Sequence, residues 1–292
     1  MTRPRRSVLF VPGSNARALE KARDLRTDGL VLDLEDSVAS DAKTRARGQI
    51  AEAIKARGFG NREVLIRINA LDSAWWHEDV RMAAQVAPDG ILVPKVSSVA
   101  QLSSVAELLA ASNGAGFLSI WVIIETPWAV SRVEELAAAA RDLQTGVAGF
   151  VFGPNDMSRE TRIRMVPGRA TMMSIIIHCM LAARAHGLEM LDGPYSDFSN
   201  PEGFALECRQ ARDLGFDGKT LIHPSQIDIC NAIFTPSAEE LGEARRIIAA
   251  FNLPENASHG AIELNGKMVE RLHAEMAKRT IAVADAIAAA TA

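Results

Sequence analysis

The sequence predicts an α/β protein folded as a (β/α)₈ TIM barrel with a C-terminal helical extension. Short apolar segments alternate with helical patterns eight times before residue 235. These segments are apolar along their length, which is typical of parallel strands that helices cover on the outside. Eight such units in this length favour a closed barrel. A doubly wound open sheet remains the rival, since strand–helix repetition alone does not show closure.

Each predicted strand is a run of mainly apolar residues that Gly, Pro or polar residues bound. The eight runs cover residues 7–11, 29–34, 63–68, 90–94, 119–124, 148–152, 188–191 and 218–222, of which the seventh is the weakest. Between the strands, helical patterns predict helices at residues 16–25, 41–57, 78–86, 99–111, 130–142, 170–185 and 201–214.

The chain is predicted to divide into a barrel, residues 1–235, and a C-terminal helical extension, residues 236–292. In the extension, helices are predicted at 238–250 and 268–290, with a loop between them that contains Gly and Asn. The Ala-rich composition of the last segment favours helix rather than disorder. No Gly/Ser linker and no low-complexity tract separates the two parts.

Composition argues against several classes of protein. Apolar residues make up 48% of the chain and charged residues 23%, as in soluble globular proteins. The net charge of −4 argues against nucleic acid or an anionic membrane as the main partner. No apolar run approaches the roughly 18 residues of a membrane span, and no apolar segment follows the basic N-terminus as in a signal peptide. Three cysteines without a CxxC pattern are expected to be free thiols, so we expect a cytoplasmic protein.

Polar side chains gather where the predicted strands end. In a parallel barrel all carboxyl ends meet at one rim, which is where the active sites of such enzymes lie. Acidic residues follow the second, fifth and sixth strands, and cationic residues lie in the third or follow the fourth. The polar residues at the strand ends are Asp33, Glu35, Asp36, Arg67, Asn69, Lys95, Glu125, Asn155, Asp156 and His223.

Each of these residues also has a purely structural explanation. Arg67 could pair with Asp33 or Glu35 and only fasten neighbouring strands. Lys95 could be a solvated loop residue, and Asp156 could cap a helix. A surface without a function, however, would not sort charge to one end of every strand. The shared position of these residues therefore predicts one charged site at the rim.

Glu125 and Asp156 follow neighbouring strands, so their carboxylates are predicted to share one cation. Mg²⁺ usually takes one or two protein carboxylates and keeps several waters, whereas zinc would need a His/Cys cluster that the sequence lacks. Arg67 offers the planar fork that binds a carboxylate through two hydrogen bonds. A metal ion beside an arginine suits reactions that build negative charge next to a carbonyl group.

An ordered set of motifs runs along nearly the whole chain. In order and spacing they resemble the citrate lyase β subunit and its relatives, the CitE-like and malyl-CoA lyase group of CoA-ester lyases in the HpcH/HpaI aldolase superfamily. The motifs are RRSVLFVPGSN (residues 5–15), LDLEDSV, LIRIN, LVPK, IIETPWAV, FGPNDM, GFDGKTLIHPSQI (residues 215–227) and, more weakly, LNGKMV (residues 264–269).

The resemblance implies a (β/α)₈ barrel with a C-terminal extension, a homotrimer or homohexamer, and Mg²⁺ as the cofactor. Coenzyme A is implied as part of the substrate, together with a 2-oxo acid. Glu125 and Asp156 match the metal ligands of the family. Arg67 matches the arginine that holds the carboxylate of the oxo acid.

Further residues match supporting positions in the family. The motif of Asp33, Glu35 and Asp36 matches acidic residues that support the metal-bound waters and the substrate-binding arginine, and Asp36 is assigned a catalytic role. Lys95 and Arg6 fall where the family lines the entrance for coenzyme A.

Two positions depart from the family pattern. The sixth strand is followed by Asn155-Asp156-Met157 where several relatives have Glu-Asp-Leu, which keeps the aspartate but removes one negative charge. Near the C-terminus, relatives often carry Gly-x-Met-Ile-Asp, whose Asp reaches the site of a neighbouring subunit as an acid or base. Here Glu270 stands at that place after Gly266, so the resemblance implies that Glu270 takes this role.

The leading functional hypothesis is a Mg²⁺-dependent carbon–carbon lyase. It would cleave or form a 3-hydroxyacyl-CoA ester such as malyl-, citramalyl- or citryl-CoA, giving a 2-oxo acid and an acyl-CoA. Two alternatives stay open: a CoA-independent metal aldolase acting on 2-oxo-3-deoxy acids, and an acyl-CoA thioesterase of the same fold. An inactive subunit is disfavoured because Arg67, Glu125 and Asp156 are all present.

Overall fold

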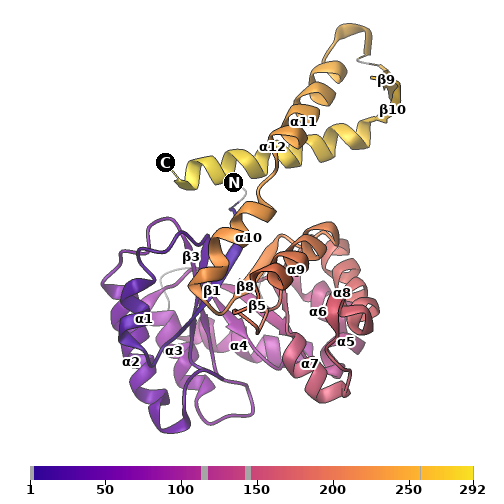
Figure 1. Cartoon of the computed structure of the whole chain (residues 1–292). Helices are drawn as coiled ribbons and strands as arrows, with labels where there is room; N and C mark the ends of the chain where they lie inside the picture. Colours follow the sequence, from indigo (N-terminus) through magenta and orange to yellow (C-terminus); the bar gives the residue numbers. More distant parts are fainter. Residues whose placement is uncertain (1–2, 113–117, 142–145, 257, 292) are drawn as a thin grey trace. The chain divides into compact units, whose positions relative to one another are not determined.

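The computed structural model describes residues 3–112, 118–141, 146–256 and 258–291. The chain forms two compact units (Figure 1). The barrel unit is Arg5–Ala232, and the C-terminal unit combines Met1–Pro4 with Ile233–Ala292. None of the helices in the described ranges combines the length and the apolar character that crossing a bilayer requires.

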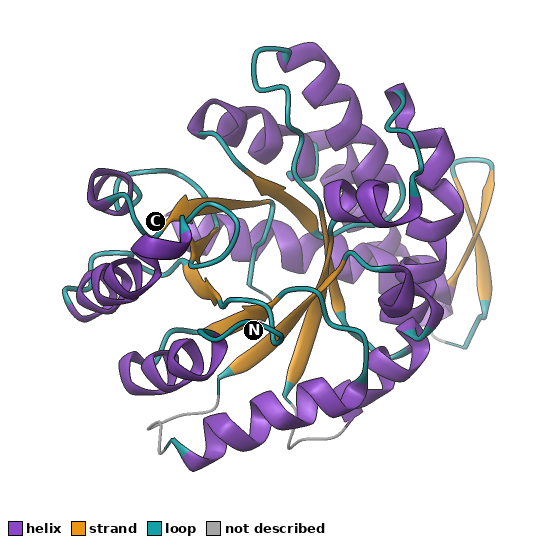
Figure 2. Cartoon of the chain, turned by 90° about the horizontal axis from the view of Figure 1, so that it is seen from below, coloured by secondary structure: helices purple, strands orange, loops and turns teal. Residues whose placement is uncertain are grey.

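The barrel unit contains eight parallel strands that close on themselves, since the eighth strand pairs with the first. The helices surround this inner ring (Figure 2). The predicted (β/α)₈ barrel is therefore confirmed, and the open doubly wound sheet is excluded. The strands are β1 (Ser7–Pro12), β2 (Gly29–Asp33), β3 (Glu63–Arg67), β4 (Gly90–Val93), β5 (Ser119–Ile124), β6 (Val147–Phe152), β7 (Glu189–Asp192) and β8 (Gly218–Leu221).

Polar side chains start several of the barrel helices. Asn15, Ser98, Thr126 and Asn200 each accept a hydrogen bond from a backbone N–H of the first helical turn. The α-helices are α1 (Ala16–Lys21), α2 (Lys43–Lys55), α3 (Trp76–Val86), α4 (Val99–Ala111), α5 (Pro127–Ser131), α6 (Val133–Ala138), α7 (Pro154–Thr161), α8 (Met173–Ala185), α9 (Pro201–Asp213) and α10 (Ile227–Phe234). Short 3₁₀ turns lie at Ser40–Ala42, Ala139–Arg141, Pro167–Met172 and Pro224–Gln226.

The helix predicted at residues 130–142 is instead divided into α5 and α6. Arg132 separates them with non-helical backbone angles, φ −122° and ψ 19°. The helical segment starts earlier than predicted because Pro127 follows the capping residue Thr126, a position where proline favours the first helical turn. The end of the prediction, residue 142, lies outside the described residues.

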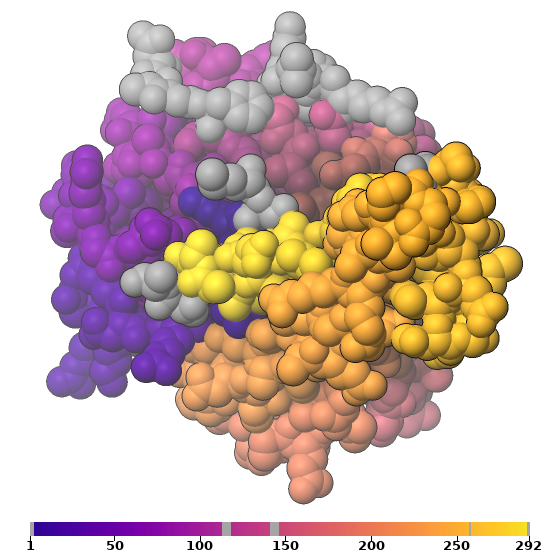
Figure 3. All heavy atoms as spheres, turned by 90° about the horizontal axis from the view of Figure 1, so that it is seen from above, coloured from indigo at the N-terminus to yellow at the C-terminus, as the bar shows by residue number. Residues whose placement is uncertain are grey.

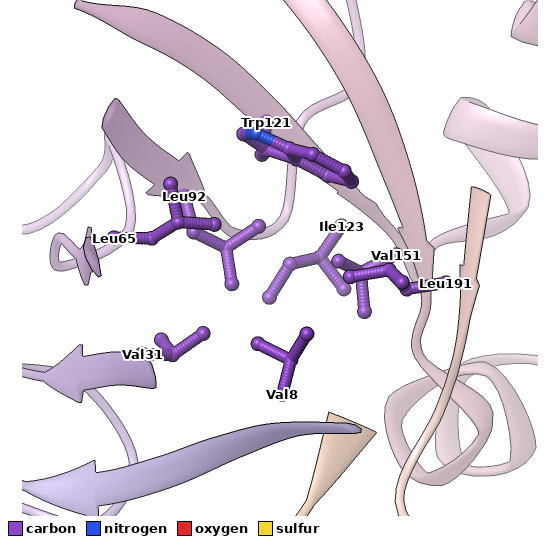
Figure 4. Close-up of a cluster of buried hydrophobic side chains, with 8 residues drawn as sticks. All are labelled: Val8, Val31, Leu65, Leu92, Trp121, Ile123, Val151 and Leu191. Atoms are coloured by element: carbon purple, nitrogen blue, oxygen red, sulfur yellow. The ribbon is translucent and has the colours of Figure 1, made fainter. Parts of the chain in front are cut away.

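Apolar side chains fill the interior of the barrel (Figure 4). Because side chains alternate along a strand, the next inward position toward the carboxyl end is two residues further on. Two residues beyond the inward-facing Val31, Leu65 and Ile123 come charged residues, which therefore also face the interior of the barrel. These are Asp33, Arg67 and Glu125. The charged layer thus lies directly above an apolar one, which consists of Val8, Val31, Leu65, Leu92, Trp121, Ile123, Val151 and Leu191.

Trp121 is the largest fully buried side chain, and it needs a glycine beside it. A Cβ atom at Gly149 would lie 2.5 Å from Cζ3 of Trp121 and 2.8 Å from its Cε3. The strand register also shifts between Ile120 and Trp121, next to Val147 and Gly149 on β6. The barrel interior therefore accommodates the indole because position 149 carries no side chain.

At the amino end of the barrel, a cluster of charged groups surrounds Arg5. Its guanidinium pairs with Glu63, with Nε 2.5 Å and Nη2 2.8 Å from the two carboxylate oxygens, and lies 5.1 Å from the centre of the Trp121 ring. Nearby, the carboxyl groups of Glu189 and Asp217 hydrogen-bond to each other. Burial and the negative charge of Asp217 raise the pKa of Glu189 to about 7.

In the C-terminal unit, α11 (Ala238–Phe251) packs against α12 (Arg271–Thr291) in the orange and yellow part of the chain (Figure 3). A short 3₁₀ turn, Pro254–Asn256, follows α11. An antiparallel hairpin of β9 (Ala261–Leu264) and β10 (Lys267–Glu270) then precedes α12. A C-terminal helix is confirmed, but it starts at Arg271, so the expected loop and the helix start at residue 268 were wrong.

The hairpin turn has a simple local cause. Asn265 and Gly266 both have positive φ, 54° and 75°, which a two-residue type I′ turn requires. Asn-Gly is the favoured pair for such a turn. Val269 of β10 packs with Phe251 and Ala274 in a small apolar cluster of the C-terminal unit, which buries one face of the hairpin.

Replacing Gly149 by Ala should destabilise the protein by about 1–3 kcal/mol, the usual cost of overpacking a core. Chemical denaturation monitored by circular dichroism measures this. Gly48→Ala is the matched control, because nothing lies within 4 Å of a Cβ at that position of α2. The control should be neutral or slightly stabilising. Equal stability of the two variants would contradict the assigned role of Gly149.

Replacing Glu189 by Gln should flatten the pH dependence of stability. The folded state raises the pKa of this carboxyl from 4.5 to about 7, so folding favours its protonated form. The contribution of this carboxyl to the stability of the fold is fully present below pH 4.5 and is lost as pH rises toward 7. Melting temperatures of wild type and variant should therefore diverge across this window, with the variant the more stable at its upper end. Glu107→Gln, an exposed change on α4, should leave the wild-type profile unchanged.

Candidate active site

Arg67 stands at the centre of the charged layer. It binds Asp33 through two parallel hydrogen bonds, Nε to Oδ1 at 2.6 Å and Nη2 to Oδ2 at 2.7 Å. Nη1 donates to Oδ2 of Asp36 at 3.3 Å and lies 3.0 Å from Oε2 of Glu35. The ring of Phe10 lies 4.8 Å from its guanidinium carbon. Three of the five N–H donors are thus engaged, and one donor each remains on Nη1 and Nη2.

Asp33 shapes the loop that follows β2. Its carboxylate accepts the backbone N–H of Glu35 at 2.9 Å and both the N–H and the hydroxyl of Ser37, at 3.1 and 2.5 Å. Burial alone would raise the pKa of Asp33, but the charge and hydrogen bonds of Arg67 hold it below its ordinary value. The aspartate therefore stays ionised and fixes both the arginine and the loop.

Lys95 follows β4 and joins three carboxylates. Its Nζ lies 2.5 Å from Oε1 of Glu35 and 3.4 Å from Oδ1 of Asp36, and its backbone N–H donates to Oε1 of Glu125 at 2.8 Å. The residue has a left-handed backbone, φ 53°, which is uncommon for a residue with a side chain. Lys95 is therefore part of the charged cluster rather than a solvated loop residue.

Glu125, which directly follows β5, is 3% exposed. Burial, followed by the negative charges of Glu35 and Asp156, raises its pKa to about 8. The backbone between β6 and α7 approaches it closely, since a Cβ at Gly153 would lie 2.4 Å from Cβ of Glu125. The site thus holds a carboxylate where its negative charge is only partly compensated by protein groups.

Asp156 lies in the first turn of α7, where Gly153 is the capping residue and no side chain caps the helix. The structure therefore does not support the explanation of Asp156 as a helix cap. Oδ1 of Asp156 lies 2.8 Å from Nη2 of Arg159, one turn further along α7. Sequence reasoning missed Arg159, although its spacing from Asp156 is the signal for a helical ion pair.

Three further polar residues at the strand ends do not belong to the charged cluster. Asn69 hydrogen-bonds to the buried Asp79 at 2.7 Å, so it holds α3 in place. His223 accepts from the backbone of Ser225 at the start of a 3₁₀ turn, which matches the structural explanation of a turn. Asn155 is exposed on α7.

Arg6 does not lie at this rim. It precedes β1, and its guanidinium pairs with Asp28, which precedes β2, through bonds of 2.8 and 2.7 Å. In a parallel barrel both positions belong to the amino end of the strands, opposite Glu125 and Lys95. The position of Arg6 does not support the expectation that it lines an entrance for coenzyme A.

Glu270 ends β10 in the C-terminal unit and is half-buried. Its backbone N–H donates to Nδ1 of His273 at 2.9 Å, which fixes the junction between the hairpin and α12. Its expected role as an acid or base in the site of a neighbouring subunit stays a prediction.

The charged cluster at the rim is electrostatically suited to a divalent cation. With every group ionised, five carboxylates face three cationic side chains, so two negative charges remain. Oε2 of Glu35 is buried and has no hydrogen-bond partner among the described residues, since Nη1 of Arg67 lies outside hydrogen-bonding geometry. The cluster consists of Asp33, Glu35, Asp36, Glu125 and Asp156 with Arg67, Lys95 and Arg159.

The donor set fits Mg²⁺. No group of three or more His, Cys, Asp or Glu side chains in the described ranges is placed to enclose a metal ion. Mg²⁺ needs no such group, because it usually takes one or two carboxylates and completes its shell with waters and substrate oxygens. Glu125 and Asp156 match this requirement, and their assignment as metal ligands remains a prediction.

A closed parallel barrel with a charged carboxyl rim of this kind is the architecture of the TIM-barrel enzymes. The chain belongs to the HpcH/HpaI aldolase/citrate lyase family, whose sequence profile matches residues 6–224. The resemblance drawn from the motifs is thus confirmed, and the protein is an enzyme of this family.

Relatives of the chain differ in their stated activity. It is 44% identical over 286 residues to a (3S)-malyl-CoA thioesterase of Cereibacter sphaeroides, covering 98% of this chain and 96% of the relative. It is 34% identical over 274 residues to the citrate lyase subunit beta of Escherichia coli, covering 92% and 89%. The crystal structure of CitE from Mycobacterium tuberculosis, in complex with magnesium, acetoacetate and coenzyme A, has a TM-score of 0.77 at 28% identity and covers 96% and 97%.

These relatives correct the leading hypothesis from the sequence. That hypothesis was a carbon–carbon lyase, with a thioesterase only as an alternative. The full-length relatives at 43–44% identity are thioesterases, whereas citrate lyase subunit beta is more distant at 34%. Motifs alone did not separate the two activities.

Replacing Glu125 by Gln should abolish Mg²⁺ binding measured by isothermal titration calorimetry, because a site with two protein carboxylates then loses half of its charge. In the wild type, Mg²⁺ affinity should increase as pH rises toward 8, since the ion binds the deprotonated carboxylate and the pKa of Glu125 is about 8. Glu160→Gln, at the exposed neighbour of Arg159, is the control and should bind Mg²⁺ normally. Normal affinity in Glu125→Gln would refute the metal assignment.

Replacing Arg67 by Lys should lower the affinity for malate in the presence of Mg²⁺ by at least about tenfold. Lysine keeps the charge but loses the planar fork that holds Asp33 and presents the two remaining donors. Calorimetry on the folded variant gives the affinity, and thermal unfolding gives the cost to stability. A lower melting temperature with unchanged affinity would show that Arg67 only fastens β2 to β3.

Proposed function

We propose that the protein is a Mg²⁺-dependent thioesterase that hydrolyses a 3-hydroxyacyl-CoA ester of the (3S)-malyl-CoA class. The observation that carries this proposal is the full-length similarity, at 42–44% identity, to proteins named (3S)-malyl-CoA thioesterase. The rim supports it, because its uncompensated carboxylates and its arginine suit a divalent cation and a substrate with a carboxylate.

In this proposal Glu125 and Asp156 hold the metal ion. When bound, Mg²⁺ supplies Lewis-acid chemistry by polarising substrate oxygens. The remaining donors on Nη1 and Nη2 of Arg67 bind the free carboxylate of the acyl group. Asp33 holds the guanidinium in one orientation, so that the substrate carboxylate meets a fixed partner.

Hydrolysis needs a group that handles the proton of the attacking water. The oxygen of water forms a bond to the thioester carbon, the carbon–sulfur bond breaks, and the proton lost by water ends on the sulfur of coenzyme A. Asp36 is the most exposed carboxylate of the cluster, with a side chain 54% exposed, and Arg67 and Lys95 restrain it from two sides. We propose that Asp36 orients the attacking water and that Glu270 of a neighbouring copy carries its proton.

Incubation with (3S)-malyl-CoA and Mg²⁺ should release free coenzyme A and malate without glyoxylate. Thiol titration follows the coenzyme, and a phenylhydrazine assay reports glyoxylate. Removal of Mg²⁺ with EDTA should stop thiol release, and re-addition should restore it. The (3R) ester is the control for recognition of the hydroxyl group. Glyoxylate formed in step with acetyl-CoA, with no free thiol, would contradict the proposal.

Glu270→Gln should slow hydrolysis by about 10² to 10⁴, the usual contribution of positioned proton transfer, and should leave folding and Mg²⁺ binding unchanged. Glu263→Gln on the neighbouring strand β9 is the matched control. If the site is shared between copies, a mixture of Glu270→Gln and Arg67→Ala subunits should recover activity that neither variant has alone. Full activity of Glu270→Gln would end its assignment.

A further inference from the structure

A buried lysine lies behind the loop that carries Glu35 and Asp36. Lys43 is the first residue of α2, yet it is only 6% exposed. Its Nζ donates to the carbonyl oxygen of Leu34 and to that of Glu35, at 2.7 Å each. The centre of the Trp75 ring lies 5.5 Å from the same nitrogen. Backbone carbonyl groups and an aromatic ring therefore hold this ammonium group inside the protein.

The loop after β2 is held between this cation and an anion. The peptide group that precedes Glu35 donates its N–H to Asp33 at 2.9 Å and offers its carbonyl to Lys43. The next peptide group, which joins Glu35 to Asp36, also directs its carbonyl to Lys43. Because a peptide group is planar, fixing its carbonyl also fixes its N–H and the Cα atoms on either side. Lys43 therefore sets the orientation of both peptide groups that flank Glu35.

Lys43 binds carbonyl oxygens, so the carboxylates of the loop remain available at the rim. Glu35 and Asp36 both contact Arg67 and Lys95 there. A buried ammonium group is costly unless neighbouring groups stabilise it. Burial lowers the pKa of Lys43, and the negative charges of nearby carboxylates limit this change. The lysine is thus held by the same charged cluster whose backbone it orients.

Arg47, one turn further along α2, has a different set of contacts. Its Nε pairs with the buried Asp79 of α3 at 2.8 Å, and its Nη2 donates to the carbonyl of Trp75 at 3.4 Å. These contacts fasten α2 to α3, and neither of them involves the loop after β2. Two cations on one face of α2 thus separate two tasks: Arg47 joins helices, whereas Lys43 holds the loop of the site.

We propose that Lys43 is a positioning residue for the hydrolytic step. Its ammonium group acts through the loop backbone on Asp36, the carboxylate proposed to orient the attacking water, and on its neighbour Glu35. A displacement of about 1 Å in such a group can cost about 10²-fold in rate, even when its cause lies away from the reacting atoms. This inference rests on the proposed thioesterase function, since that function supplies the attacking water.

Kinetics separate positioning from stability. Lys43→Met removes the charge and the donors but keeps an unbranched side chain, and it should lower kcat for (3S)-malyl-CoA by about 10- to 100-fold. KM and the affinity for Mg²⁺ should stay unchanged, because Arg67 keeps its bonds to Asp33 and the proposed metal ligands follow other strands. Lys43→Arg restores a cation with donors and should recover part of kcat. Arg47→Met is the matched control, which should lower the melting temperature and leave kcat unchanged.

Amide hydrogen exchange tests the same inference without turnover. In the folded protein Asp33 accepts the N–H groups of Glu35 and Ser37, so these amides should exchange slowly. Lys43→Met should speed exchange in a peptide that covers residues 34–38, because the loop loses its support from the other side. Arg47→Met should leave exchange in this peptide as in the wild type. Wild-type exchange of the loop in Lys43→Met would overturn the proposal.

The outcomes distinguish this proposal from its basis. If the wild type does not hydrolyse (3S)-malyl-CoA, the proposed function fails, and hydrogen exchange still decides whether Lys43 positions the loop. If Lys43→Met lowers only the melting temperature, as Arg47→Met does, Lys43 serves stability alone and the inference is refuted. A raised KM with unchanged kcat also refutes it. If Lys43→Met does not fold, Lys43→Gln, which keeps an NH₂ donor without the charge, takes its place, and wild-type kcat in that variant refutes the inference.

Discussion

The ion pair between Arg67 and Asp33 organises the carboxyl rim. The two residues are direct register partners on β2 and β3, and both point into the barrel above the apolar layer. A buried charge without its partner is costly, about 3–5 kcal/mol when one member of such a pair is removed. Here the pairing of β2 with β3 places Asp33 beside Arg67. Asp33 also fixes the loop after β2, so Glu35 and Asp36 take their positions from the same carboxylate that orients Arg67.

The apolar layer beneath this pair explains why the remaining charges interact strongly. Val31, Leu65 and Ile123 exclude water from one side of the cluster, so the carboxylates of Glu35, Glu125 and Asp156 influence one another at short range. Lys95 and Arg159 balance part of this charge, and the remainder is what suits the cluster to the proposed cation. The charges that hold the rim together are therefore also those that the proposed metal site would use.

Most of the barrel could be predicted from sequence because its parallel strands are short, apolar and evenly spaced. The charged residues at the strand ends were also predictable, since alternation along a strand leads from Val31 to Asp33 and from Leu65 to Arg67. The hairpin before α12 was missed although Asn265-Gly266 carries its signal. Arg6 was misplaced because a motif match does not say at which end of a strand a side chain is used. The motifs also did not distinguish a lyase from a thioesterase, since side chains that suit a metal ion and a carboxylate do not determine which bond of a substrate breaks.

Trp121 fills the interior of the barrel on the side away from the rim. Its indole fills the interior beside Gly149, and the guanidinium of Arg5 lies against it from the amino end, 5.1 Å from the ring centre. A barrel of this kind is a packed core and not a pore. Under the proposed thioesterase function, substrate and products therefore use one opening, and the two halves of the cleaved thioester leave along the route by which it entered. Under that function, the product that is held more deeply leaves after the other has cleared this opening.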